Sequence, residues 1–296
     1  MRETSQLVSI GFPTYNGSLR IKRAIDSLLV QSYKNFEFII SDNASEDNTK
    51  EICLEYAKKD SRIKYFRQEK NIGLTKNFEF VFEQAVGQYF MWAADDDLWD
   101  ADFISALKSA LDKDKNCGVV MSSLDIVYDD GEPFKQVKFY GENDVSRMKP
   151  GALFDAVVIK KPAVHFFIHG LFRAELLKKL FWQPLPNILG ADKILICEAA
   201  LFMRFCSVPD ILWFRTVHRE SDIKRYSRDY STVVFDKKAH SKHAWTMAVR
   251  LFGSPNITWQ LKLFLLPAKI IFLVWAERKH LFREIFPWMF NLVKKI

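Results

Sequence analysis

The sequence predicts an α/β fold, a mainly parallel sheet flanked by helices, with a helical extension at the C-terminal end. Three observations support this. Short apolar runs alternate with amphipathic stretches of helical spacing over the first hundred residues. The intervening helices have the length of βαβ crossovers, which makes neighbouring strands parallel. Polar clusters follow three of the strands, and such sheets bind ligands beyond the carboxyl ends of their strands.

The first part of the chain alternates strand and helix. The helix after the first strand shows its pattern clearly, since Ile21, Ala24 and Ile25 recur at helical spacing. Pro13 is expected to end the first strand, and Gly87 to stop the third helix. The expected strands are 8–12, 36–40, 63–66 and 89–93, and the expected helices are 20–31, 46–58 and 74–85.

The segment from 118 to 215 is less regular. Asp129-Asp130-Gly131 predicts the turn of a β-hairpin. Strands are expected at 118–122, 125–128 and 165–172, and helices at 174–181 and 192–205.

Composition sets the class of protein. A chain of 296 residues that is 49% hydrophobic can form one large domain with an appendage, or two small domains. It contains no repeat and no low-complexity segment, and its first residues do not resemble a signal peptide. The four cysteines are widely spaced and form no CxxC pair, so we expect neither a zinc site nor a redox pair, but separate core residues of a cytosolic protein.

The C-terminal segment carries most of the net charge of +7. Residues 251–296 contain seven Lys or Arg and two Glu, and the remainder is rich in Leu, Ile, Phe and Trp. This composition indicates an anionic membrane surface rather than nucleic acid as partner. Within it, Trp259–Ala276 is mostly apolar but contains Lys262, Pro267 and Lys269, which favours a helix lying in the membrane interface over a spanning one. A helix packed on the core is the alternative.

An acidic run, Asp95-Asp96-Asp97, directly follows the strand expected at 89–93. Gly-x-Gly occurs nowhere in the chain, so a glycine-rich phosphate loop is excluded and a bound diphosphate needs another positive charge. Adjacent carboxylates at a strand end can hold Mg²⁺ or Mn²⁺, which in turn holds the diphosphate. The alternative is a solvated turn.

Four motifs resemble the family 2 inverting glycosyltransferases, which have the GT-A fold, a Rossmann-like α/β fold. They stand in the family's order and spacing, and weaker similarity continues at 169–177, 190–202 and 213–219. The motifs are VSIGFPTYNG at 8–17, IISDNASEDNT at 39–49, EKNIGLTKNF at 69–78 and GQYFMWAADDDLW at 87–99.

The resemblance implies a role for each matching residue. Asp192 falls where such enzymes keep the catalytic base, and Asp96 and Asp97 fall where they bind the metal. His218 falls in a loop that often closes on the diphosphate. The residues expected around the nucleotide-sugar are Pro13, Thr14, Tyr15, Asp42, Asn43, Asn71, Gly73, Asp95, Asp96 and His218, with Asp42 accepting a hydrogen bond from the base.

One position departs from the family pattern, Asp-x-Asp-Asp before Leu-Trp. Its first acid is Ala94 here. Either Asp95 substitutes for it and pairs with Asp97, or only Asp96 and Asp97 remain.

Three further side chains have competing interpretations. Asp192 begins a helix, so its charge also suits the helix dipole. Glu198, six residues on, is the rival carboxylate for the catalytic base. His165 and His169 stand four residues apart, but Phe-Phe-Ile between them favours a strand over a metal-binding helix.

These observations predict a catalytic domain at 1–215 and a membrane-associating helical extension at 216–296. The expected reaction moves a sugar from a nucleoside-diphosphate sugar to an acceptor hydroxyl with inversion, aided by Mg²⁺ or Mn²⁺. The acceptor is expected to be a glycan or lipid-linked sugar of O-antigen or other surface-polysaccharide assembly, at the inner face of the cell membrane. The alternatives are a sugar-nucleotide nucleotidyltransferase and a non-catalytic scaffold that binds nucleotide-sugar.

Overall fold

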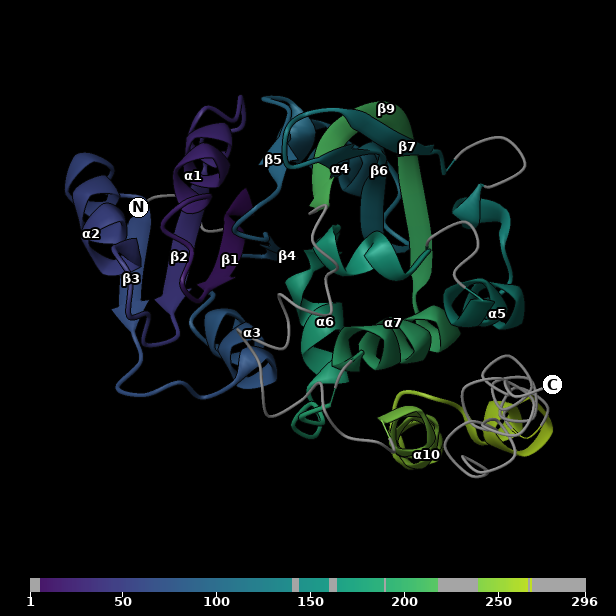
Figure 1. Cartoon of the computed structure of the whole chain (residues 1–296). Coiled ribbons are helices and arrows are strands. Elements are labelled where there is room, and N and C mark those ends of the chain that lie inside the picture. Colours follow the sequence, from purple (N-terminus) through teal and green to yellow (C-terminus); the bar gives the residue numbers. More distant parts are fainter. Residues whose placement is uncertain are drawn as a thin grey trace, which may run out of the picture.

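The computed structural model describes residues 6–139, 144–159, 164–188, 190–217, 239–265 and 267. They contain a nine-stranded sheet in the order β3-β2-β1-β4-β8-β6-β9-β5, with β7 paired to β6 (Figure 1). β3, β2, β1, β4, β6 and β9 point in one direction, and β5, β7 and β8 run opposite. This confirms the expected mixed α/β class with a mainly parallel sheet.

The first half consists of the predicted alternating units. Its strands are β1 (Val8–Thr14), β2 (Phe36–Asp42), β3 (Ile63–Arg67), β4 (Tyr89–Trp92) and the short β5 (Leu98–Trp99). Its helices are α1 (Ile21–Leu29), α2 (Thr49–Lys59), α3 (Leu74–Glu83) and α4 (Phe103–Lys113).

Burial explains why these segments form these elements. Every residue of β1 and β2 is buried, as expected for central strands of a parallel sheet covered on both faces. On α1 the buried residues are the ones at helical spacing, Ile21, Ala24, Ile25 and Leu28.

Pro13 does not end β1, contrary to the expectation from sequence. Pro13 pairs with Ser41, and Thr14 pairs with Asp42. On the other side, β4 pairs with β1 only up to Gly11. At Pro13 the strand therefore has a single neighbour, where proline is tolerated.

The second half closes the sheet through non-sequential strands. Its strands are β6 (Cys117–Tyr128), β7 (Pro133–Val137), β8 (Leu171–Arg173) and β9 (Arg204–Val217). Its helices are η3 (Val145–Arg147), α5 (Pro150–Ile159), η4 (Val164–His169), α6 (Ala174–Leu180) and α7 (Ala191–Phe202). The predicted hairpin is confirmed, because β6 and β7 are antiparallel and Gly131 has φ +88°.

Two expectations in this half were wrong. The strands expected at 118–122 and 125–128 are one strand, β6, whose pairing with β9 shifts register near Ser123. The strand expected at 165–172 is the 3₁₀ helix η4 followed by β8. Phe167 and Ile168 are both buried, which a one-sided strand does not allow for adjacent residues. Ring contacts with Phe139 and Phe205 hold Phe167 in this turn.

The described C-terminal residues form α10 (Ala239–Gly253) and a π-helical turn, η5 (Leu261–Leu265). α10 lies beside α7, on the far side of the molecule from α1 and α2 (Figure 1). In the part of the chain that the structure describes, no helix has the length and apolar character needed to cross a bilayer. Most of the apolar stretch Trp259–Ala276 lies outside the described residues. The domain boundary at 215 stays a prediction, and β9 runs two residues beyond it.

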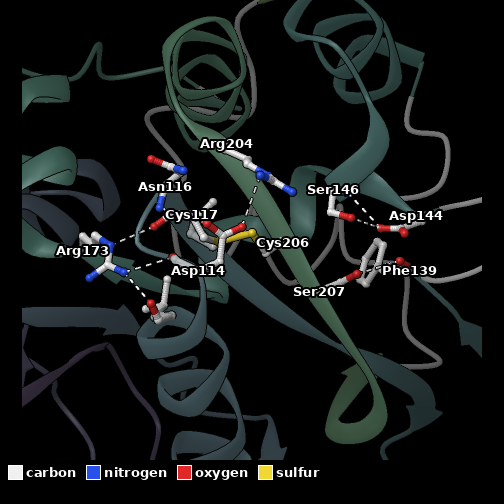
Figure 2. Close-up of a disulfide and its surroundings, with 12 residues drawn as sticks. Asp114, Asn116, Cys117, Phe139, Asp144, Ser146, Arg173, Arg204, Cys206 and Ser207 are labelled. Atoms are coloured by element: carbon white, nitrogen blue, oxygen red, sulfur yellow. Dashed lines mark hydrogen bonds and ion pairs between the residues drawn. A yellow bond between two sulfur atoms is a disulfide. The ribbon is translucent and has the colours of Figure 1, made fainter.

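Two of the four cysteines are not separate core residues. Cys117 of β6 and Cys206 of β9 form a disulfide, with Cα atoms 6.1 Å apart (Figure 2). Arg173 donates to the carbonyl of Cys117 beside it. The two cysteines are 89 residues apart in sequence, so only the pairing of β6 with β9 reveals their proximity. Cys53 and Cys197 are free and buried, as expected.

Candidate active site

The acidic run begins with a carboxylate that is already paired. Arg20 donates to both oxygens of Asp95, Nε to Oδ1 at 2.8 Å and Nη2 to Oδ2 at 3.0 Å. The hydroxyl of Thr14 donates to Asp95 Oδ2 at 2.6 Å. Arg20 also binds the carbonyls of Tyr15 and Asn16. Asp95 thus ties the end of β1 and the loop after it to the end of β4.

Gly17 makes this arrangement possible. A Cβ at Gly17 would lie 2.6 Å from Thr14 Oγ1 and 2.9 Å from Asp95 Oδ2, closer than real Cβ atoms come to other atoms. Any larger residue would therefore displace the bonded pair.

Asp97, in contrast, is held by neutral donors. Trp213 Nε1 donates to its Oδ2 at 3.1 Å, and the backbone N–H of Thr216 donates to its Oδ1 at 2.9 Å. Burial and the neighbouring charge of Asp96 raise the pKa of Asp97 to about 8, although Arg215 opposes this shift. A cation bound beside Asp97 would favour its ionised form.

His169 connects the acidic run to the candidate base. Its Nδ1 lies 3.2 Å from the carbonyl oxygen of Trp92, the last residue of β4. Burial lowers the pKa of His169 to about 4; Arg215 lowers it further, while Asp192 and Asp96 oppose the shift. These three charges thus act on one imidazole, which is neutral at pH 7 and donates through Nδ1.

The two candidate carboxylates on α7 have different surroundings. Asp192 is exposed in the first turn of the helix, next to Gly190, which has φ +82°. Glu198 is fully buried and accepts hydrogen bonds from Trp182, Arg250, Ser254 and Asn256. Of these two, only Asp192 presents its carboxylate to solvent.

The ends of β1 and β2 meet beside the acidic run, as the topology predicts. The backbone N–H of Asn43 donates to the carbonyl of Thr14 at 2.9 Å. The side chain of Asn43 bonds to Asn71 and to the N–H of Ile72, which fixes the loop that ends at Gly73, where φ is +86°.

Asp42 is fully buried among protein donors. It accepts hydrogen bonds from Ser45 N, the Tyr65 hydroxyl and Arg67 Nη1, each at 2.8 Å. Its described bonds therefore order the loop after β2. Pro13 and Thr14 are also buried, and Tyr15 is partly exposed at the same edge. His218 lies outside the described residues.

The chain matches the sequence profile of Glycosyl transferase family 2 over residues 9–181, more than half of its 296 residues. It belongs to glycosyltransferase family 2. It is 38% identical over 117 residues to an uncharacterized glycosyltransferase of Rickettsia typhi, covering 40% of this chain and 36% of that protein. It is 30% identical over 133 residues to the putative teichuronic acid biosynthesis glycosyltransferase TuaG of Bacillus subtilis, covering 45% and 52%. The chain thus spans about half or less of the length of these relatives.

Solved structures of low sequence identity share the fold. The 1–349 fragment of S. aureus TarS in complex with UDP-GlcNAc superposes with a TM-score of 0.68 at 18% identity, over 92% of this chain and 73% of that one. Mannosyltransferase PcManGT from Pyrobaculum calidifontis, in complex with GDP-Man and Mn²⁺, gives 0.61 at 17% identity, over 93% and 72%. This family 2 glycosyltransferase therefore has the expected GT-A architecture.

A divalent metal fits the acidic run only with help from a ligand. No three His, Cys, Asp or Glu side chains among the described residues gather into a ready-made metal site. Mg²⁺ is, however, commonly held by one or two carboxylates together with substrate phosphates. Asp96 and Asp97 fit that arrangement, because they are adjacent carboxylates and the hydrogen bonds described for Asp97 come from neutral donors. Asp95 fits it less well, because both its oxygens face Arg20.

Several residues of this candidate site could not be identified from the sequence. Arg20 lies six residues after Thr14, at the start of α1, and a basic residue at a helix start indicates no site by itself. Trp213, Arg215 and Thr216 lie in the segment 213–219, where the resemblance indicates a role for His218 alone. For His169 the sequence offers only its spacing from His165, which is a reason to test a metal ligand and not an electrostatic interaction with Asp192.

Proposed function

We propose that this chain transfers a sugar from a nucleoside-diphosphate sugar to an acceptor hydroxyl, with inversion at the anomeric carbon. The observation that carries the proposal is the geometry of the acidic run: Thr14 at the end of β1 donates to Asp95, and Trp213 and Thr216 of β9 donate to Asp97. This arrangement supports a metal–diphosphate centre at the ligand-binding edge of the sheet, and the exposed carboxylate of Asp192 supports its role as the base.

The reaction is a single displacement. The acceptor oxygen bonds to the anomeric carbon as the bond from that carbon to the diphosphate oxygen breaks. Asp192 takes the proton of the acceptor hydroxyl, and the nucleoside diphosphate leaves with the electron pair. Bound Mg²⁺ or Mn²⁺, held by Asp96 and Asp97, supplies positive charge for the leaving diphosphate. His169 stays neutral, so it adds no second charge beside Asp192.

The nucleotide end of the donor is assigned to Pro13, Thr14, Tyr15, Asp42, Asn43, Asn71 and Gly73. These residues line the ends of β1 and β2 and the loop fixed by Asn43. Asp42 is fully buried, so a base contact there requires a neighbouring group to move aside. His218 is assigned to the diphosphate by family resemblance alone.

The acceptor is proposed to be a lipid-linked glycan of surface-polysaccharide assembly, such as an O-antigen, at the inner face of the cell membrane. The name of TuaG, a putative teichuronic acid biosynthesis glycosyltransferase, is compatible with that setting. The basic, apolar composition of residues 251–296 supports membrane association.

A donor screen tests the proposal. UDP-, GDP- and dTDP-sugars are added to the full chain with Mn²⁺, and the thermal midpoint is followed. A donor at about 100 times its Kd adds ~2.7 kcal/mol of stability. Donor turnover in the same mixtures separates an enzyme from a non-catalytic scaffold. No stabilisation by any of these donors would contradict the proposal.

A further inference from the structure

Helix α10 has two opposite faces, one buried and one apolar but exposed. His243, Met247, Arg250 and Leu251 are buried against the body of the protein. Trp245 is 73% exposed, Val249 53% and Phe252 44%. At about 100° per residue, the second group falls on the side of the helix opposite to the first. We call Trp245, Val249 and Phe252 the outer stripe.

The exposure of these residues is unusual within this protein. Ten large apolar side chains are exposed in the described part of the chain, and five of them lie between 245 and 263. Beyond the outer stripe these are Trp259, 63% exposed, and Leu263, 62% exposed. The remaining five are scattered at Leu19, Val30, Leu54, Val86 and Phe134. Apolar exposure concentrated in one segment of the chain indicates a contact surface, whereas scattered exposure does not.

The buried face fixes the orientation of the outer stripe. Arg250 Nε donates to Glu198 Oε2 of α7 at 2.6 Å, and both side chains are almost completely inaccessible. One end of α10 also reaches the start of α7, where His243 Nε2 lies 3.2 Å from the carbonyl oxygen of Gly190. The helix therefore cannot turn its apolar stripe inward without breaking a buried ion pair.

The charge of the segment that contains the outer stripe favours one kind of partner. The sequence contains no Asp or Glu from 237 to 276. Besides Arg250, which is buried and paired with Glu198, it contains five Lys there: Lys237, Lys238, Lys242, Lys262 and Lys269. A second copy of this chain would bring the same positive charge to the same face. An anionic lipid surface is complementary to it, and tryptophan favours the boundary between lipid headgroups and chains.

We propose that the outer stripe of α10 is the face that this protein inserts into an anionic membrane surface. Because α10 contacts Gly190, two residues before Asp192, the stripe would place the candidate base about one helix diameter, ~10 Å, above the lipid. The geometry suits an acceptor hydroxyl carried on a membrane lipid. This last step rests on the proposed function, whereas the lipid contact itself does not.

Vesicle binding of the full chain tests the proposal. The variant Trp245→Ser/Val249→Ser/Phe252→Ser removes the outer stripe without touching the buried face. The control Val30→Ser/Val86→Ser/Phe134→Ser removes three equally exposed apolar residues elsewhere. With vesicles of 70% phosphatidylcholine and 30% phosphatidylglycerol, the stripe variant should bind roughly tenfold less tightly or worse, and the control should bind as the native chain does. Pure phosphatidylcholine and high salt should each weaken native binding.

Three results would overturn the proposal. The native chain could fail to bind either kind of vesicle, or the stripe variant could bind as tightly as the native chain. The native chain could also be a dimer in solution while the stripe variant is a monomer. Hydrolysis of the donor found in the screen is measured in parallel, without membranes. Unchanged hydrolysis in the stripe variant with lost vesicle binding supports the proposal. If no donor stabilises the native chain but vesicle binding is intact, the proposed function is contradicted and the lipid contact is still supported.

Discussion

Arg250 of α10 and Glu198 of α7 form a wholly buried ion pair, with Nε and Oε2 2.6 Å apart. Glu198 also accepts hydrogen bonds from Trp182, Ser254 and Asn256. A buried carboxylate that accepts hydrogen bonds from four residues stabilises the fold. It joins the helix that carries Asp192 to the C-terminal part of the chain.

Breaking this pair should destabilise the protein without abolishing its chemistry. Arg250→Met leaves Glu198 buried without its cation and should cost about 3–5 kcal/mol. The double variant Glu198→Leu/Arg250→Met should recover much of that loss, since no charge is then stranded. Urea denaturation of the three proteins measures this. Equal stability of Arg250→Met and the native chain would show that the pair is not buried in solution.

Asp192→Asn should reduce turnover by about 10²-fold or more while leaving donor affinity nearly unchanged. The matched control is Glu198→Gln on the same helix, which should lower stability rather than turnover per folded molecule. Steady-state kinetics at a temperature where both variants remain folded distinguishes them. If Glu198→Gln removes turnover and Asp192→Asn does not, the base is assigned to the wrong carboxylate.

EDTA should abolish transfer, and Mn²⁺ or Mg²⁺ should restore it. The transfer activity of Asp97→Asn should not be restored by either cation, because the amide cannot supply the negative charge that holds the cation. Asp95→Asn should be impaired even in excess Mn²⁺, because it loses the bidentate contact that holds Arg20 and the loop after β1. Full activity in EDTA would rule out the metal-assisted mechanism.

His169 should make the protein less stable in acid. Its pKa is lowered from 6.5 to about 4 in the folded state, mainly by burial, so between these values the unfolded chain binds more protons. Stability should therefore fall as pH drops from about 6.5 towards 4, by up to about 3 kcal/mol from this group. His169→Asn keeps a donor for the Trp92 carbonyl and should flatten this part of the stability curve. Identical curves of stability against pH for the native chain and His169→Asn would show that His169 does not cause the loss of stability in acid.

Truncation tests how the C-terminal extension belongs to the fold. Removing residues 259–296 keeps Arg250, Ser254, Asn256 and the buried Ile257, so the protein should remain folded and bind the donor. Removing residues 239–296 strips Glu198 of three of its four partners and should give an unfolded or insoluble chain. Circular dichroism and donor-induced stabilisation report the two outcomes. A stable, donor-binding 1–238 fragment would support an independent catalytic domain.

The fold class and the ligand-binding edge of the sheet could both be predicted from the sequence. Strand and helix periodicity specify βαβ units, and the carboxyl ends of parallel strands must lie at one edge. Thr14, Asp42, Asn43 and Asp95 could therefore be placed together before any contact was known. The strand predicted from periodicity at 165–172 was wrong, because two adjacent buried apolar residues in a tight turn give the same pattern as a strand.

Which charged side chains contact one another depends on the packing of the whole chain. The sequence left open whether Asp95 pairs with Asp97 or only Asp96 and Asp97 remain, and the position of Arg20 distinguishes Asp95 from the other two. It left Glu198 and Asp192 as rivals, and α10 buries the first beneath Arg250. It also gave no reason to pair Cys117 with Cys206. Local periodicity reports which face of an element is apolar, whereas electrostatics depends on contacts between residues far apart in sequence, such as Arg20 with Asp95 and Trp213 with Asp97, which only the packed chain brings together.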